Sequence, residues 1–149
     1  MRAVVQRVKE ASVEVDGKII SKIGNGLLVF VGINHDDTEK DSDYIIAKCL
    51  GLRIFEDDGG LMNLSLCDVK GQVLVVSQFT LYGDARKGRR PSFSDAMKPD
   101  LAAAFFDRFV AKFKEAYSDV FTGEFQSHME VKLINSGPVT ILLDSKRLF

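Results

Sequence analysis

Polar side chains follow directly on an apolar run in residues 72–81. Residues 73–76 are all Val or Leu, as in a buried strand, and Ser77, Gln78 and Thr80 come next with no turn between. Polar groups at the end of a buried strand need hydrogen-bond partners. They either satisfy one another or a neighbouring strand, or they line a pocket of the kind that α/β proteins form where strands end. The residues alone leave both interpretations open.

Ser77 and Thr80 are the candidate nucleophiles of this stretch, but the chain offers little to activate them. Only His35 and His128 could supply the imidazole of a serine-type triad, and both have the surroundings of surface residues. The sequence has no glycine-rich phosphate loop, no carboxylate pair of clear spacing and no Cys/His cluster with metal-ligand spacing. We therefore expect no metal and no cofactor. Catalysis, if it occurs, should depend on backbone groups and on the substrate.

The Gly137-Pro138 pair lies between two apolar runs of strand type, residues 129–134 and 139–143. A Gly-Pro pair interrupts a strand ladder, because proline donates no hydrogen bond and glycine packs nothing. One interpretation is a tight turn. The other is a site where the backbone comes unusually close to a ligand, since Gly137 has no Cβ.

Four cations fall within five residues in the loop predicted at residues 82–93: Arg86, Lys87, Arg89 and Arg90. Such a run is either a solvated face or a contact for nucleic-acid phosphates, which would position a nucleic acid without reading its sequence. The net charge of −1 provides no general attraction for polyanions, so such a partner must be held by a local patch.

The periodicity predicts the elements that position these residues. Strands are expected at residues 2–15, with a bend or bulge near residues 10–11 that divides them in two, and at 18–23, 27–33, 53–55, 73–76, 121–133 and 139–143. Helices are expected from Thr38 or Asp41 to about Leu52, and from Pro99 onward. The order βββ-α-ββ-α-ββ predicts a single mixed α/β domain over residues 1–149. Its sheets should be largely antiparallel, in a barrel-like or two-layer arrangement, with two main helices covering one side.

Bulk composition points to the cytoplasm. Two cysteines, Cys49 and Cys67, are too few for a disulfide framework and suit a reducing compartment. No apolar run approaches the ~20 residues that cross a bilayer, and the alternating residues at the N-terminus are unlike a signal peptide. We expect no membrane partner.

Two motifs, Ser77-Gln78-Phe79-Thr80-Leu81 and the segment from Asn135 to Thr140, together resemble the signature pair of D-aminoacyl-tRNA deacylases. Similar segments recur along nearly the whole chain, among them Arg53-Ile54-Phe55, Arg90-Pro91-Ser92-Phe93 and Thr122-Gly123-Glu124-Phe125. Two departures stand out. Ser136 replaces a common Asp, and residues 126–128 replace a smaller Gly-Ala-containing stretch near the site for the terminal adenosine.

The resemblance implies a homodimer that hydrolyses the ester between a D-amino acid and the 3′ end of tRNA. Gly137 and Pro138, joined by a cis bond, would reach into the partner subunit's pocket and act as the chiral filter. Their carbonyls would hold the α-amino group of the substrate and leave no space for an L side chain. A site that selects by exclusion should also admit glycine, so glycyl-tRNA, including glycine mischarged on tRNA-Ala, is an expected side substrate.

The resemblance also assigns the other residues. Ser77, Gln78, Phe79 and Thr80 would form the pocket wall and the donors around the scissile carbonyl. Thr80 is one candidate for the catalytic group, and the ribose 2′-hydroxyl of the tRNA, activating water, is the other. Phe125 and Met129 would pack near the adenine, and Arg7 would orient the segment that contains Gly137 and Pro138. The acceptor-stem phosphates would be bound by four cations: Arg86, Lys87, Arg89 and Arg90.

Two other functions remain open at this point. The chain could be a non-catalytic RNA-binding module that uses the patch from Arg86 to Arg90. It could also deacylate another ester or amide, with tRNA irrelevant.

Overall fold

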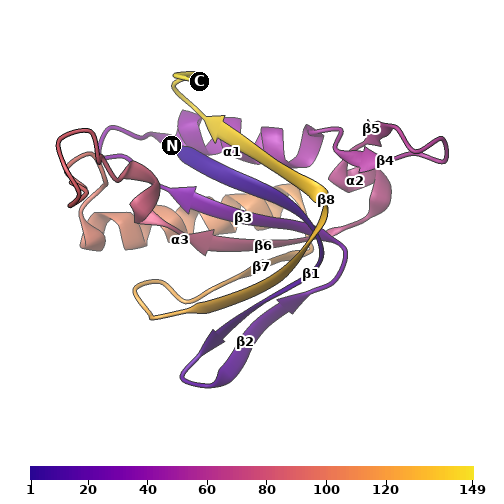
Figure 1. The fold of residues 1–149 in the computed structure, drawn as a ribbon, viewed down its shortest axis with the longest axis horizontal. Helices are drawn as coiled ribbons and strands as arrows, with labels where there is room; N and C mark the ends of the chain where they lie inside the picture. The colour runs from indigo at the N-terminus through magenta and orange to yellow at the C-terminus, as the bar shows by residue number, and fades with distance from the viewer.

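One long strand, β1 (Arg2–Val15), organises the sheet in the computed structural model, which describes residues 1–149 (Figure 1). Along one edge β1 pairs with β8 (Glu130–Asp144). Along the other edge its first half pairs with β3 (Gly26–Gly32) and its second half with β2 (Lys18–Ile23). All three pairings are antiparallel. The turn between β1 and β2 is an Asp-Gly hairpin turn, with positive φ at both Asp16 and Gly17.

The rest of the sheet is parallel. β6 (Gln72–Ser77) pairs with β3, and β7 (Val120–Thr122) pairs with β6. The sheet curls so that β7, at one end of the strand order, returns to β2 at the other end. There the Ser21 hydroxyl of β2 donates a 2.5 Å hydrogen bond to the carbonyl of Thr122 in β7. The result is the predicted mixed α/β fold with a near-closed, barrel-like sheet, less antiparallel than expected because β3, β6 and β7 run in one direction.

The two predicted main helices are present. At the start of α1 (Glu39–Gly51), the Asp41 carboxylate accepts hydrogen bonds from the N–H of Thr38 at 2.7 Å and from its hydroxyl at 2.9 Å, as in a capping box. α3 (Pro99–Ala116) begins with proline at its first position, where the missing N–H costs nothing. Both helices pass behind the strands in Figure 1. None of the helices combines the length and the apolar character that a bilayer crossing requires.

A small region between α1 and β6 departs from the prediction. The strand expected at residues 53–55 is β4 (Phe55–Glu56), which pairs with β5 (Met62–Leu64). A four-residue helix, α2 (Leu66–Val69), follows. Its capping box of Ser65 and Asp68 is a local signal that could have revealed it.

The sheet has an apolar core on each face. The larger core contains 21 buried residues, and α3 contributes Phe105, Phe106, Phe109 and Phe113 to it at helical spacing. The smaller core lies inside the curl of the sheet and contains Val8, Val13 and five other buried residues. With apolar packing on both faces, the strands give the loops at their ends a rigid support.

Two predicted strand boundaries were wrong. The irregularity expected near residues 10–11 is a bulge at Lys9, but it does not divide β1 into two strands. β8 runs without interruption through Gly137 and Pro138, so the interpretation as a tight turn is incorrect. The break between the last two strands falls at residues 123–129 instead. The Gly137-Pro138 peptide bond is cis.

The Gly-Pro pair is accommodated as a wide bulge. Asn135 pairs with Val8 and Thr140 pairs with Gln6, so four residues of β8 lie opposite the single residue Arg7. A bulge lets a strand absorb residues that cannot join the ladder while pairing continues on both sides. We call residues 135–140 the Gly-Pro loop.

Candidate functional site

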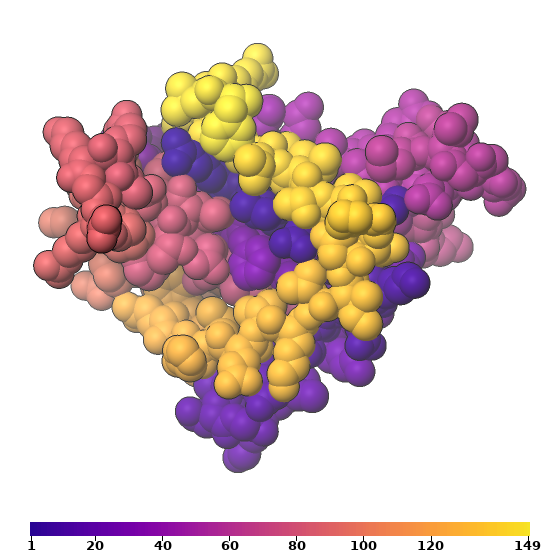
Figure 2. Space-filling view, viewed as in Figure 1, coloured from indigo at the N-terminus to yellow at the C-terminus, as the bar shows by residue number.

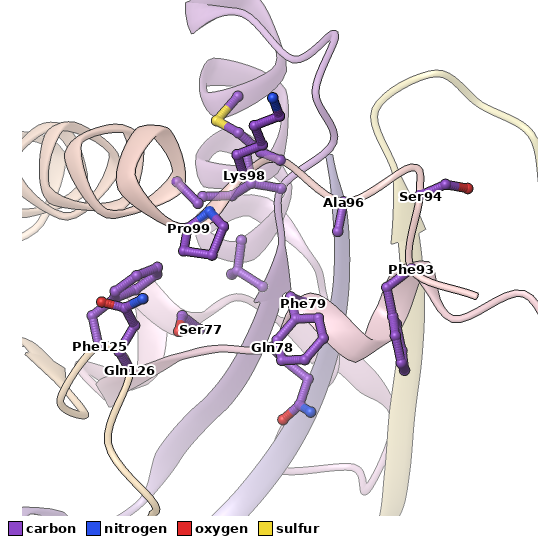
Figure 3. A pocket seen from close by; sticks show the side chains of 14 residues that line it. Ser77, Gln78, Phe79, Phe93, Ser94, Ala96, Lys98, Pro99, Phe125 and Gln126 are labelled. Carbon is purple, nitrogen blue, oxygen red and sulfur yellow. The ribbon is translucent and has the colours of Figure 1, made fainter. Parts of the chain in front are cut away.

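A cavity of about 480 Å³ opens where β6 ends (Figure 3). Its walls come from the end of β6, from the segment that leads into α3, and from residues 125–126 after β7. Phe125 and Gln126 lie on one side in Figure 3, across from Phe79 and Phe93. Eight of the fourteen lining residues are hydrophobic. An apolar cavity with a few polar groups is the usual form of a small-ligand site.

The polar groups of the cavity are almost all neutral. Ser77, Gln78, Ser94 and Gln126 can donate or accept hydrogen bonds, and Lys98 is the only titratable residue among the fourteen. No histidine, cysteine or carboxylate lines the cavity. The site can therefore hold and polarise a substrate, but it has no imidazole, thiolate or carboxylate to act as a general base.

The predicted catalytic stretch bends sharply at the cavity. β6 ends at Ser77, and a 3₁₀ helix, η1 (Phe79–Tyr82), follows Gln78. Ser77, Gln78 and Phe79 line the cavity, whereas Thr80 lies beside it and its hydroxyl accepts a hydrogen bond from the Gln78 amide. The first N–H groups of a helix have no partner within it, so the start of η1 offers backbone donors next to the cavity.

Arg7 fixes the Gly-Pro loop from outside. Its guanidinium is buried and donates to the Ser136 carbonyl from Nε at 2.8 Å and to the Ile54 carbonyl from Nη1 at 2.7 Å. Nη2 lies 3.2 Å from a carboxylate oxygen of Glu56. The rigid fork of the guanidinium thus ties the loop to the segment before β4.

Asn135 fixes the same loop from within. Its Nδ2 donates to the Gln6 side chain at 3.0 Å, to the Val139 carbonyl at 3.0 Å and to the Thr140 hydroxyl at 3.3 Å. Its Oδ1 accepts from the Val139 N–H at 2.8 Å. One side chain therefore closes the loop across Gly137 and Pro138.

Gly137 has no room for a side chain. Its φ is +137°, and a Cβ there would lie 2.9 Å from Nη2 of Arg7. This close packing is against the same chain, and the predicted close approach of Gly137 to a ligand stays a prediction. Gly137 and Pro138 are both exposed, and neither lines the cavity of its own chain.

The cationic loop, residues 84–92, projects from the left edge of the molecule in Figure 2. Two hydrogen bonds of 2.7 and 2.9 Å between the main chains of Asp84 and Ser92 close its base. Arg86 forms a bidentate pair with Asp84, at 2.8 and 2.7 Å, and these side-chain hydrogen bonds hold the pKa of Asp84 below its usual range. The other three cations, Lys87, Arg89 and Arg90, are exposed and form no ion pair.

The two residues predicted near the adenine are separated. Phe125 lines the cavity and packs against Phe106, with ring centroids 5.8 Å apart. Met129 does not line the cavity and packs against the smaller core. Gln126, one of the residues flagged as a departure from the family pattern, is at the cavity with a positive φ of 62°.

Several residues of the site were given no individual role from the sequence. Phe93 and Lys98 line the cavity, and Asn135 holds the Gly-Pro loop. An aromatic residue at the end of a cationic run is a recognisable local signal for Phe93. No local signal reveals the hydrogen bond of Asn135 to Gln6, which is 129 residues distant in the chain.

Comparisons with known proteins agree on one family. The family model "D-Tyr-tRNA(Tyr) deacylase" matches residues 4–144. Proteins named D-aminoacyl-tRNA deacylase from Kosmotoga olearia and Clostridioides difficile are 62% and 58% identical over 149 residues, covering the whole of both chains.

Solved structures share the fold. A structure named c-Myc DNA Unwinding Element Binding Protein superposes with a TM-score of 0.92 and 41% identity, over 97% of this chain and 98% of the other. A second, titled as a probable eukaryotic D-amino acid tRNA deacylase, has a TM-score of 0.81 and 21% identity over 95% of this chain and 97% of the other. The latter supports the fold alone.

Proposed function

The chain belongs to the D-Tyr-tRNA(Tyr) deacylase family, and on this premise we propose that it is a hydrolase that cleaves the ester between a D-amino acid and the 3′ end of tRNA. The observation that carries the proposal is the match of the entire chain to proteins named for this activity. The neutral cavity at the end of β6 suits an acylated nucleoside, which is largely apolar at its base and side chain.

Chiral selection is assigned to Gly137 and Pro138, inserted into the cavity of a partner subunit. Two observations support this assignment. The pair is exposed and lies outside the cavity of its own chain. Arg7 and Asn135 hold its backbone in place, as a filter that acts by shape requires. A rigid main chain can exclude an L side chain while its carbonyls bind the α-amino group.

A homodimer is the assembly that this filter requires. β8 pairs with a strand on one edge only, so its other edge is open to a second chain. Large apolar side chains on β8 are exposed, with Leu133 at 36%, Ile134 at 50% and Leu142 at 59%. A free strand edge with apolar neighbours is typical of a surface that pairs with another copy.

Catalysis is assigned to a water molecule that the ribose 2′-hydroxyl of the substrate activates. Water adds to the ester carbonyl, and the bond to the ribose 3′-oxygen breaks as that oxygen takes up a proton. The N–H groups at the start of η1 and the Gln78 amide would stabilise the negative charge on the carbonyl oxygen. The absence of a side-chain base in the cavity favours this route over attack by Thr80.

The tRNA would be held by its terminal adenosine in the cavity, against Phe125, and by its acceptor-stem phosphates on the cationic loop. Met129 would act indirectly, by packing against the smaller core and not by contacting the adenosine. We place the enzyme in the cytoplasm. Glycyl-tRNA is an expected side substrate, because glycine has no side chain for the filter to exclude.

The decisive experiment incubates the protein with D-tyrosyl-, L-tyrosyl- and glycyl-tRNA side by side and follows the release of amino acid. The proposal expects rapid release of D-tyrosine and glycine and none of L-tyrosine. Release of both tyrosine enantiomers at equal rates would contradict chiral selection. Cleavage of the D-ester with complete resistance of the glycyl ester would contradict the steric account.

A Thr80→Ala variant separates the two catalytic routes. Substantial residual turnover is expected, whereas a substrate with a 2′-deoxy terminal adenosine should be nearly inert. Complete loss of turnover in Thr80→Ala, with substrate binding intact, would assign the nucleophile to Thr80.

Nucleic-acid binding without catalysis is the second candidate function. It is favoured by the three unpaired cations of the cationic loop and by the name of the DNA-binding structural neighbour. It predicts that the protein binds RNA but releases no amino acid from any D-aminoacyl-tRNA.

A further inference from the structure

An aromatic side chain, Phe93, lies between the cavity and the cationic loop. It immediately follows that loop in the chain and contributes to the cavity wall. Phe93 is 38% exposed, a large fraction for an apolar residue of this size. Nothing in the catalytic proposal uses this ring.

The position of the ring is fixed from two sides. Phe79 meets it edge-on, with ring centroids 5.1 Å apart and an interplanar angle of 70°. Gly83 lies close to its edge, so close that a Cβ on Gly83 would be 3.1 Å from Cε1 of Phe93. The main-chain pairing of Asp84 with Ser92 holds the residue just before it. Phe93 is therefore an exposed ring that is held in a defined place.

The surroundings of the ring favour single-stranded nucleic acid over other ligands. Proteins bind single strands by combining cations that follow the phosphates with aromatic rings that stack on the bases. Here the unpaired cations Lys87, Arg89 and Arg90 lie within six residues of Phe93, and the cavity lies on its other side. Phe125 is across the cavity from Phe93 in Figure 3. A strand whose last nucleoside is at Phe125 can leave the cavity over Phe93 toward the cations.

We propose that Phe93 is a stacking subsite for the base of the nucleotide that precedes the terminal adenosine of the RNA. The inference rests on the proposed function, which places that adenosine in the cavity. Phe79 acts as the edge-on support of the stacking ring. The subsite accepts any base, because every base offers a π-face, so it adds affinity for a strand and not sequence specificity.

The test compares two esters: the 3′-O-D-tyrosyl ester of adenosine, and the same ester on the trinucleotide CCA, which adds the preceding nucleotide and one more on its 5′ side. In the wild type the trinucleotide should have the higher kcat/KM, by about ten-fold, as expected for one stacked base. Phe93→Ala should abolish most of this preference, mainly through KM. Phe93→Tyr should retain it, and Phe93→Leu, which keeps the apolar bulk without the π-face, should lose it.

Phe121→Ala is the matched control. Phe121 is 36% exposed, almost the same as Phe93, but it lies on β7 and does not line the cavity. This variant should keep the wild-type preference for the trinucleotide. Thermal melting of each variant identifies any that fail to fold, and Phe93→Leu then takes the place of Phe93→Ala.

A binding measurement makes the test independent of catalysis. The probe is the trinucleotide with an amide in place of the ester and 2-aminopurine at the penultimate position, whose fluorescence is quenched by stacking. Quenching by the wild type and by Phe121→Ala, but not by Phe93→Leu, would support the subsite. Equal quenching by all three, or a wild-type preference that Phe93→Ala leaves unchanged, would overturn it.

The two proposals fail in different ways. If the wild type cleaves neither ester, the proposed function is wrong, and the quenching experiment still decides the subsite. If Phe93→Ala lowers kcat/KM equally for both esters, Phe93 is only a wall of the cavity. If Phe93→Ala changes the oligomeric mass and the wild type does not quench the probe, the ring is a subunit contact. Each of the last two results would overturn the subsite.

Discussion

Gly88 and Gly137 have almost the same backbone φ, +136° and +137°, in opposite surroundings. Gly88, in the cationic loop, has no atom within 4 Å of the place where a Cβ would be. Gly137, in the Gly-Pro loop, has a guanidinium nitrogen and a valine methyl group 2.9 Å from that place. One loop is open and the other is packed.

The difference follows from what each loop is proposed to do. A filter that separates mirror-image substrates acts by shape, so its main chain must be held within a fraction of an ångström. Attraction between charges extends over about 8–10 Å in salt solution and tolerates movement of the groups that carry it. We infer that the Gly-Pro loop should be sensitive to any loss of its supports, and that the cationic loop should be sensitive only to loss of charge.

Removing Arg7 should have the largest effect. Arg7→Ala leaves the Ser136 and Ile54 carbonyls without their donor, and unsatisfied buried groups of this kind cost about 1–3 kcal/mol each. We expect a loss of about 3 kcal/mol in the free energy of unfolding, measured by urea denaturation. Turnover of D-tyrosyl-tRNA should fall about 100-fold, because the Gly-Pro loop shifts.

Arg53→Ala provides the control for Arg7. Arg53 also donates to a main-chain carbonyl, that of Asn63 at 2.7 Å, but it is exposed. Its removal should cost less than about 1 kcal/mol and leave turnover unchanged. Equal losses of turnover in the two variants would show that the loop does not depend on Arg7.

Alanine substitutions at Gly88 and Gly137 test the comparison between the open and the packed loop directly. Gly137→Ala and Gly88→Ala introduce the same backbone strain, of about 1–3 kcal/mol, at nearly the same φ. Only the alanine at 137 also displaces Arg7. We expect D-tyrosyl-tRNA turnover to fall at least ~10-fold for Gly137→Ala and to stay at the wild-type rate for Gly88→Ala. If both variants lose turnover equally, strain and not close packing is the cause.

Neutralising the unpaired cations should act on binding alone. In the triple variant Lys87→Ala, Arg89→Ala, Arg90→Ala, we expect a higher KM for tRNA with unchanged kcat and unchanged unfolding free energy. Each lost phosphate contact should reduce the slope of log KM against log salt by about 0.7–0.9. The measurement is a salt titration of the steady-state kinetics.

Three exposed lysines elsewhere serve as the matched control for that variant: Lys18, Lys40 and Lys114. None of them forms an ion pair, so the control removes the same charge from other elements. The salt slope should then stay close to that of the wild type. A similar decrease of the salt slope in both triple variants would mean that tRNA binding depends on the net charge of the protein and not on the cationic loop.

The same contrast explains how much the sequence could predict. The start of α1 after Thr38 and the start of α3 at Pro99 depend on neighbours in the chain, and both were predicted correctly. The four cations were also visible as a run of adjacent residues, because a charge patch needs no partner. Such features are local.

The Gly-Pro loop is different because its supports come from afar. Local rules say that Gly137 and Pro138 should end a strand, yet β8 continues, because β1 pairs with it on both sides of the bulge. The hydrogen bonds from Arg7 to Ser136 and from Asn135 to Gln6 each join residues 129 positions apart. The resemblance to a family suggested a role for Arg7, but no pattern of neighbours could have assigned its three contacts.

Within the cationic loop, Arg86 should matter less than Arg89. Asp84 already balances Arg86 through two hydrogen bonds, and these keep the pKa of that carboxyl low, so the pair stays charged on both sides at neutral and mildly acidic pH. Arg86→Ala should therefore change the salt slope less than Arg89→Ala. Asp84→Asn should instead increase the salt slope, because it removes the negative charge that balances Arg86. The amide oxygen of the asparagine can still accept the hydrogen bond from the Arg86 N–H. The salt slope of this variant should rise by up to about 0.7–0.9, and a slope below the wild-type value would show that Asp84 is needed to shape the loop.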